Sequence, residues 1–132
     1  MDKIVLSGFA DEISSSLDRQ IQVLKKLGIS HMEIRGVEKK GIDTYTTEEV
    51  KEIKGKLDDQ GIAISSLASP IGKINIKDDF TPHLEHFKHV AELAHVLNTR
   101  YIRMFSFFMP EGEEPDGYKA VSYTHLTLPT IA

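Results

Sequence analysis

The chain has 132 residues, 40% of them hydrophobic and 27% charged, which is ordinary for one globular domain, and its net charge of −4 disfavours nucleic acid as the main partner. Cysteine is absent, which excludes disulfides and thiolate metal sites. The first apolar run is too short for a signal peptide and no run reaches membrane-spanning length, so the composition predicts a cytoplasmic protein without a membrane partner.

Short apolar segments alternate with helical patterns from the start of the chain. Lys3–Ser7 predicts a first strand, and Gly8–Ser16 predicts a loop whose serines can cap a helix. Apolar residues then recur at helical spacing, namely Leu17, Ile21, Leu24 and Leu27. Gly28 follows as the usual C-terminal stop, and Ile29–Arg35 predicts a second strand.

The same alternation continues through the middle of the chain. Thr46 and Glu49 have the spacing of a capping box and predict a helix that ends at Gly61. Ile62–Leu67 predicts a third strand. A third helix is expected to begin at Thr81–Pro82, because proline suits a first helical turn. Its predicted apolar stripe consists of Leu84, Phe87, Ala91, Ala94 and Leu97.

A fourth predicted strand, Tyr101–Phe107, completes the order β-α-β-α-β-α-β. Strands that alternate with amphipathic helices predict a parallel sheet with right-handed crossovers. Two architectures have this order: an open doubly wound sheet and one half of a (β/α)8 barrel. The turn Ser7–Ala10 lacks the G-x-G-x-x-G pattern, which disfavours a dinucleotide-binding sheet.

Charged residues inside the predicted strands favour the barrel. In the second strand one face carries His31, Glu33 and Arg35, and the other carries Met32 and Ile34. The fourth strand repeats this division, with Tyr101, Arg103 and Phe105 opposite Ile102 and Met104. Helices cover both faces of a doubly wound sheet, where charges are costly, whereas one face of a barrel points into the lumen. We therefore predict an α/β fold, the N-terminal half of a (β/α)8 TIM barrel, with about four parallel strands and three helices.

Four segments at the predicted strand ends resemble those of the sugar phosphate isomerase/epimerase family, which belongs to the xylose-isomerase-like TIM barrels. They are Gly8–Ile13, His31–Gly36, Ser69–Ile74 and Tyr101–Phe108, and the resemblance covers Lys3 to about Lys119. It implies one divalent metal, Mn²⁺ or Mg²⁺ or sometimes Zn²⁺, and proton transfer beside a sugar carbonyl. The family's metal ligands, typically two Glu, an Asp and a His or Gln, follow strands five to eight. No metal and no activity are therefore expected of these four strands alone.

The end of the chain is interpreted separately. Val121–Thr130 matches the in-frame translation of a transposase-type sequencing-library adapter, and the alternative is a genuine polar strand with a proline stop. On the first interpretation, residues 1–119 are a partial barrel and residues 120–132 are a non-native tail.

Four side chains near the predicted strand ends are candidates for binding a sugar or sugar phosphate: Glu33, Arg35, Lys73 and Arg103. Arginine suits anionic oxygens because its donors form a rigid fork, and lysine offers a point charge. The alternative for Glu33 is an internal ion pair with Arg103, and the alternative for Lys73 is a solvated loop residue. No catalytic residue and no metal ligand is assigned.

Other polar and aromatic residues have two interpretations each. Ser66 and Ser69 either bind a sugar or make local turns. The aromatic residues Phe9, Phe105, Phe107 and Phe108 either form a wall for the sugar or belong to the core. Asp11 and Glu12 form a pair of carboxylates that is not expected to bind metal, and Asp11 is expected to make local turn bonds instead. The string of His83, His86 and His89 is expected on a solvated helix face.

Two other functions are compatible with this fold. An apurinic endonuclease of the same superfamily would place metal-binding histidines after strands three and four, where this chain has Ser66–Ser69 and Phe105–Ser106. A non-catalytic sugar-binding module is the second alternative. In every case the first and fourth strands leave open edges, which predict possible self-association.

Overall fold

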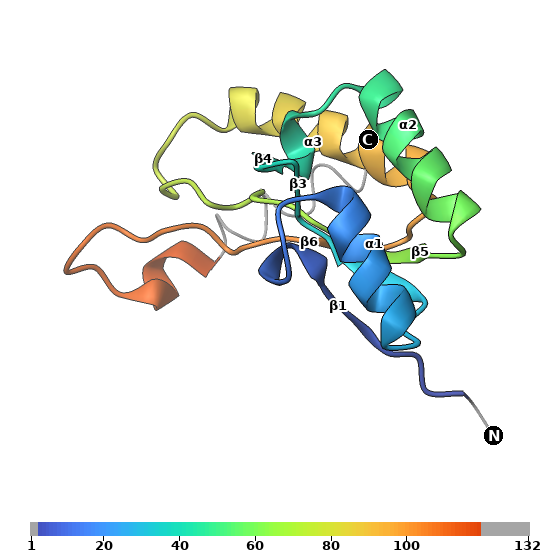
Figure 1. The fold of residues 1–132 in the computed structure, drawn as a ribbon. Coiled ribbons are helices and arrows are strands. Elements are labelled where there is room, and N and C mark those ends of the chain that lie inside the picture. The colour runs from blue at the N-terminus through green and yellow to red at the C-terminus, as the bar shows by residue number, and fades with distance from the viewer. Residues whose placement is uncertain (1–2, 120–132) are drawn as a thin grey trace.

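The computed structural model describes residues 3–119, so the predicted tail, residues 120–132, lies outside the described part. Four strands form a parallel sheet in the order β1-β2-β5-β6, and the three helices α1, α2 and α3 pack on one side of it (Figure 1). This arrangement confirms the predicted four parallel strands and three α-helices. None of the described helices is long and apolar enough to span a bilayer.

The first unit consists of β1 (Ser7–Phe9), α1 (Leu17–Lys26) and β2 (His31–Ile34). Ser16 caps the helix by accepting a hydrogen bond from the Arg19 N–H. Gly28 follows the helix with φ of +70°, a conformation that favours glycine. The prediction of Gly28 as the helix stop is consistent with this geometry.

The next units follow the predicted order. Helix α2 (Thr47–Asp59) begins with the capping box, in which the Thr46 hydroxyl accepts from the Glu49 N–H and the Glu49 carboxylate accepts from the Thr46 N–H. Strand β5 (Ala63–Ala68) and helix α3 (Phe80–Val96) come next. Asp79 caps α3, and Pro82 lies in its first turn as predicted.

The first and last strands differ from their predicted bounds. Ile4 and Leu6, predicted inside a strand, are 89% and 66% exposed, because the partner strand β2 begins opposite Ser7. At the other edge, β6 is only Ile102–Arg103. Beyond it the chain pairs with the loop after β5, and Phe107 has φ of +76°, which breaks the extended backbone.

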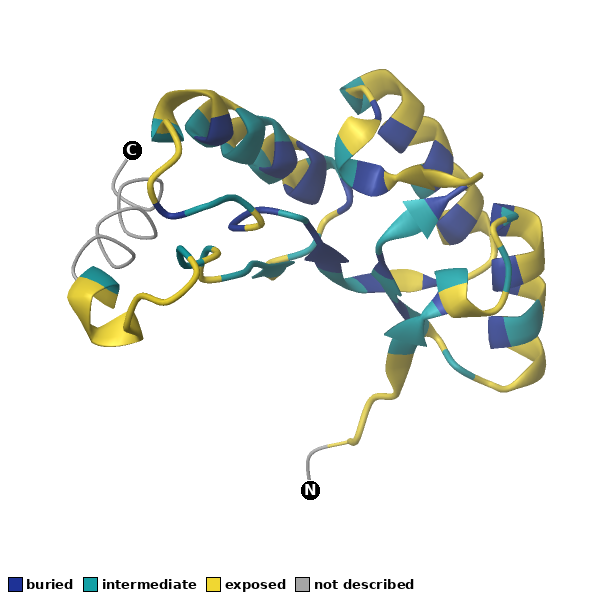
Figure 2. Ribbon diagram, turned by 90° about the vertical axis from the view of Figure 1, so that its left-hand side faces the viewer, coloured by how far each residue is buried: buried dark blue, intermediate teal, exposed yellow. Residues whose placement is uncertain are grey.

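The core lies between the sheet and the helices. Met32 and Ile34 are 1% exposed, while Glu33 between them is half-buried on the opposite face, as the alternation predicts. Figure 2 shows the buried bands of the helices turned toward the sheet. The stripe predicted for α3 is only partly correct, since its most buried apolar residues are Val90, Leu93, Ala94 and the following Leu97.

A hairpin follows β2 directly. Strands β3 (Gly36–Val37) and β4 (Lys40–Gly41) pair antiparallel and are joined by Glu38 and Lys39. Short 3-10 helices precede α1, follow the hairpin and lie near the end of the described part, namely Ala10–Glu12, Ile42–Thr44 and Pro115–Tyr118. The hairpin stands at the C-terminal end of the sheet, where barrel active sites form.

Candidate functional site

A row of alternating cations and aromatic rings crosses the C-terminal end of the sheet on the side opposite the helices. The Arg35 guanidinium lies 4.6 Å from the Phe9 ring centroid, and that of Arg103 lies 5.8 Å from the same ring. Arg103 is also 4.7 Å from the Phe105 ring, over which the Lys73 ammonium lies at 4.6 Å. This cation–aromatic row, Arg35–Phe9–Arg103–Phe105–Lys73, brings together three of the four predicted binding residues.

Arg35 is held by the two carboxylates after β1. Its Nε and Nη2 donate to the two oxygens of Asp11 at 2.7 and 3.0 Å, and Nη2 also donates to Glu12 at 2.6 Å. These hydrogen bonds, first from Asp11 and then from Glu12, raise the pKa of Arg35. Asp11 thus bonds to Arg35, which follows the next strand, whereas the sequence had predicted bonds within its own turn.

Arg103 is fixed by the end of β5. Its Nη2 donates to the Ser69 carbonyl at 3.2 Å, and the Ser69 hydroxyl donates to the Arg103 carbonyl at 2.7 Å. That hydroxyl also accepts from the Ile71 N–H, so the buried Ser69 serves the local structure. The Arg103 Nε is buried without a hydrogen-bond partner among the described residues.

Glu33 lies on the same face of the sheet as the row but is not part of it. No ion pair connects Glu33 to Arg103 or to any other cation of the described residues. The alternative of an internal Glu33–Arg103 pair is therefore not realised, because Arg103 is directed toward the aromatic rings instead. Glu33 remains a half-buried carboxylate that faces the side of the sheet opposite the helices.

His83, His86 and His89 of α3 do not form the solvated face that the sequence predicted. The Gly72 N–H donates to His83 Nε2 at 2.8 Å, His86 Nε2 lies 3.0 Å from Asp43 Oδ2, and His89 Nε2 lies 2.7 Å from the Tyr45 carbonyl. The expectation was wrong because the first half of α3 extends over the loops that follow β2 and β5. The histidines therefore hold loops at the candidate site. Their three-residue spacing, which places them on one face of the helix, was the feature of the sequence that could have indicated this role.

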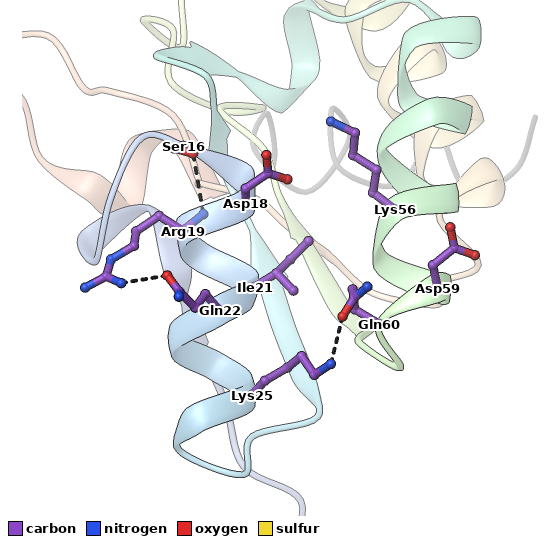
Figure 3. A pocket seen from close by; sticks show the side chains of 9 residues that line it. All are labelled: Ser16, Asp18, Arg19, Ile21, Gln22, Lys25, Lys56, Asp59 and Gln60. Atoms are coloured by element: carbon purple, nitrogen blue, oxygen red, sulfur yellow. Dashed lines mark hydrogen bonds between the residues drawn. The ribbon is translucent and has the colours of Figure 1, made fainter.

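A further groove lies away from this row. It has a volume of about 960 Å³ and runs between α1 and α2 on the helical side of the sheet (Figure 3). Its walls carry charges of both signs, including Asp18, Lys56 and Asp59, and the Lys25 ammonium donates to Gln60 across it at 2.7 Å. The groove belongs to the outer helical layer and does not contact the cation–aromatic row.

A second, smaller cleft of about 360 Å³ lies directly beside Arg35 at the C-terminal end of the sheet. The hairpin residues Lys39 and Lys40 line it together with Asp11. Sequence reasoning missed both lysines, because Glu-Lys is not a sequence typical of a two-residue hairpin turn. The glycines at the two ends of the hairpin, Gly36 and Gly41, were the only local indication of a turn.

Comparisons with known proteins support the fold through structure alone. No family model matches the chain, and no curated protein matches its sequence. The solved structure of the probable 3-DHS dehydratase AsbF from Bacillus anthracis is similar, with a TM-score of 0.73 and 16% identity over 96% of this chain and 47% of that one. The chain therefore has the α/β fold of half a TIM barrel, as predicted.

Two further solved structures have a similar fold. The 3-keto-D-glucoside 4-epimerase YcjR from E. coli has a TM-score of 0.61 and 15% identity, over 95% of this chain and 50% of that one. A xylose isomerase-like TIM barrel protein from Mycobacterium smegmatis, in complex with magnesium, has a TM-score of 0.63 and 13% identity, over 95% and 49%. Both likenesses support the half-barrel fold, and the chain spans about half the length of these structures.

Proposed function

We propose that the chain forms half of a (β/α)8-barrel enzyme that moves a proton beside the carbonyl of a sugar or sugar phosphate and so isomerises or epimerises it. The cation–aromatic row is the observation that carries this proposal, because it lies at the C-terminal end of the strands, where TIM-barrel enzymes have their active sites. The structural similarity to an epimerase and to a probable dehydratase supports the proposal of proton transfer beside a carbonyl.

Each member of the site has a role that its surroundings suit. Arg103 and Lys73 offer positive charge to anionic or hydroxyl oxygens, while the rings of Phe9 and Phe105 offer apolar surface to the carbon face of a sugar. Arg35 is positioned by its two carboxylates, and Glu33 supplies an acceptor for sugar hydroxyls. These four polar residues bind the substrate in the proposal, and none of them is assigned a catalytic role.

The described residues do not suit a divalent metal by themselves. Among residues 3–119 no three His, Asp or Glu side chains converge, and hard cations need several convergent oxygen ligands. We therefore derive no metal-dependent step from this chain. A Mn²⁺, Mg²⁺ or Zn²⁺ ion and the acid and base groups belong, in the proposal, to strands that complete the barrel, so this chain alone is inactive.

The test measures exchange of substrate hydrogen with solvent by a complete barrel, in which the proposed remaining strands are joined to this chain. Enzymatic proton transfer in D₂O places deuterium beside the carbonyl of a ketose or ketose phosphate, and mass spectrometry detects it. Arg103→Met is expected to raise KM, whereas the matched control Arg100→Met, on an exposed arginine outside the row, leaves KM unchanged. Tight sugar binding without exchange would instead indicate a non-catalytic sugar-binding module, and cleavage of abasic DNA would indicate an endonuclease.

A further inference from the structure

The cleft beside Arg35 is a separate feature from the cation–aromatic row, although it shares that residue. Its walls are formed by one serine, two glycines and four charged side chains, namely Ser15, Gly36, Gly41, Asp11, Arg35, Lys39 and Lys40. Three of these charges are positive and one is negative. The residues that line the cleft therefore carry more positive than negative charge, although the net charge of the chain is −4.

The hairpin that forms one wall is anchored firmly to the rest of the fold. The Glu38 N–H donates to the Ser15 carbonyl at 2.7 Å, and the Glu38 carboxylate accepts from the Leu17 N–H at the start of α1 at 2.9 Å. Below the turn, the Tyr45 hydroxyl donates to the carbonyl of the buried Val37 at 2.6 Å. These contacts fix the backbone that carries the two lysines.

The turn itself has an unfavourable backbone conformation. Glu38 and Lys39 have φ of 51° and 65°, in the left-handed region where hairpin turns usually place Asn or Gly. Such conformations persist where the surrounding structure determines them, and they occur often at ligand-binding sites. Here the anchored Glu38 holds the turn, and Lys39 is presented at the rim of the cleft.

The carboxylates around the cleft already have partners. Asp11 and Glu12 bind Arg35, and Glu38 binds the start of α1. The Lys40 ammonium lies 4.1 Å from the Tyr45 ring centroid and 3.9 Å from Glu49 Oε2. Lys39 has no ion pair or hydrogen bond from its ammonium to any described residue, so its charge is available to a ligand.

We propose that this cleft binds the phosphate group of a phosphorylated sugar, with Lys39 as the main ligand and Lys40 as the second cation. Ammonium groups bind phosphate as point charges. A ligand carboxylate should bind less well than phosphate. The Nε–Nη2 edge of Arg35, whose two donors suit a carboxylate, is already bonded to Asp11. The inference rests on the proposed function, since it names the substrate class of that site, but phosphate binding can be measured on this chain alone.

The experiment is a titration of the isotope-labelled chain with inorganic phosphate, followed through the backbone amides of Ser15, Gly36 and Gly41. We expect a saturable shift of these amides, and Lys39→Gln should weaken phosphate about tenfold, the loss of one charge-assisted hydrogen bond. Lys40→Gln should weaken it less. The matched control is Lys88→Gln, which removes an exposed lysine that pairs with Glu85 on α3 and should leave the affinity unchanged.

Three results would overturn the phosphate site. They are a shift that rises without saturation, equal affinities for Lys39→Gln and Lys88→Gln, and acetate binding as tightly as phosphate at the same amides. Unchanged amide dispersion elsewhere in the spectrum shows that each variant is folded.

The completed barrel separates this inference from the proposed function. There, Lys39→Gln should raise KM for a phosphorylated sugar and leave KM for its unphosphorylated form unchanged. Saturable phosphate binding without turnover of any sugar would refute the proposed function and leave the phosphate site standing. Turnover of sugar phosphates that is insensitive to Lys39→Gln would refute the phosphate site and leave the proposed function standing.

Discussion

The Arg103 guanidinium lies 5.8 Å from the ring of Phe9, although the two residues belong to opposite edge strands of a four-stranded sheet. Neighbouring strands are about 4.8 Å apart, so a flat sheet would separate β1 and β6 by about 14 Å. The two long side chains therefore reach toward each other across the sheet, on the side opposite the helices. A sheet that curls as a barrel wall does would shorten this gap and gather the cation–aromatic row.

The ion pair between Arg35 and Asp11 should contribute measurably to stability. Asp11 is mostly buried and accepts two hydrogen bonds from the guanidinium, whereas Glu12 is largely exposed and accepts one. Asp11→Ala should lower the free energy of unfolding by about 1–2 kcal/mol, and the control Glu12→Ala by less than about 0.5 kcal/mol, because solvent screens exposed pairs. Urea denaturation measures both, and equal losses would contradict this assignment.

Gly72 should tolerate no side chain. Its φ is +89°, and a Cβ at this position would collide with the carbonyl oxygen of Phe105, which belongs to the backbone that pairs with this loop. We expect Gly72→Ala to cost about 2–4 kcal/mol. The control Gly55→Ala, in open space within α2, should stabilise the protein by about 0.5–1 kcal/mol. A neutral Gly72→Ala in thermal unfolding would mean that the two loops do not pack as described.

The capping box of α2 should make stability depend on acid pH. The hydrogen bonds from the backbone and hydroxyl of Thr46 lower the pKa of Glu49. A carboxylate with a lowered folded-state pKa stabilises the fold above its unfolded value of about 4.3 and loses that contribution as the pH falls through the folded value. The stability difference between the wild type and Glu49→Gln should therefore shrink as the pH drops below about 4.

The matched control for this acid dependence is Glu48→Gln, which removes the same charge from the same turn without touching the cap. Denaturation at a series of pH values makes the comparison. A pH-independent difference for Glu49→Gln, or an identical profile for Glu48→Gln, would show that the cap does not depend on the ionised carboxylate.

The open edge at β1 should lead to self-association. Ile4, Val5 and Leu6 are 89%, 56% and 66% exposed beside this edge. Unpaired strand edges with apolar side chains favour pairing with another chain. We expect dimers or larger species at micromolar concentrations, and Ile4→Lys with Leu6→Lys should shift the chain toward monomer in sedimentation velocity. The control Leu27→Lys, on a residue 64% exposed after α1, should leave the association unchanged.

Several features of this protein follow from the sequence because their causes are local. The capping box of Thr46 and Glu49 and the left-handed Gly28 depend on hydrogen bonds and backbone conformations within a few residues. The alternation of Met32 and Ile34 with Glu33 follows from the two-residue period of a strand. These signals were enough to predict the parallel half-barrel and the face of the sheet that carries the charges.

The tertiary structure decided the contacts between segments far apart in the chain. Asp11 is 24 residues from Arg35, and His86 is 43 from Asp43, so neither pairing leaves a local pattern. The Glu38–Lys39 turn could not be predicted either, because its conformation opposes the preference of its own residues and is held by contacts with α1. Local energetics selected the helices and strands, but packing between loops at the C-terminal end of the sheet determined which side chains meet at the candidate site.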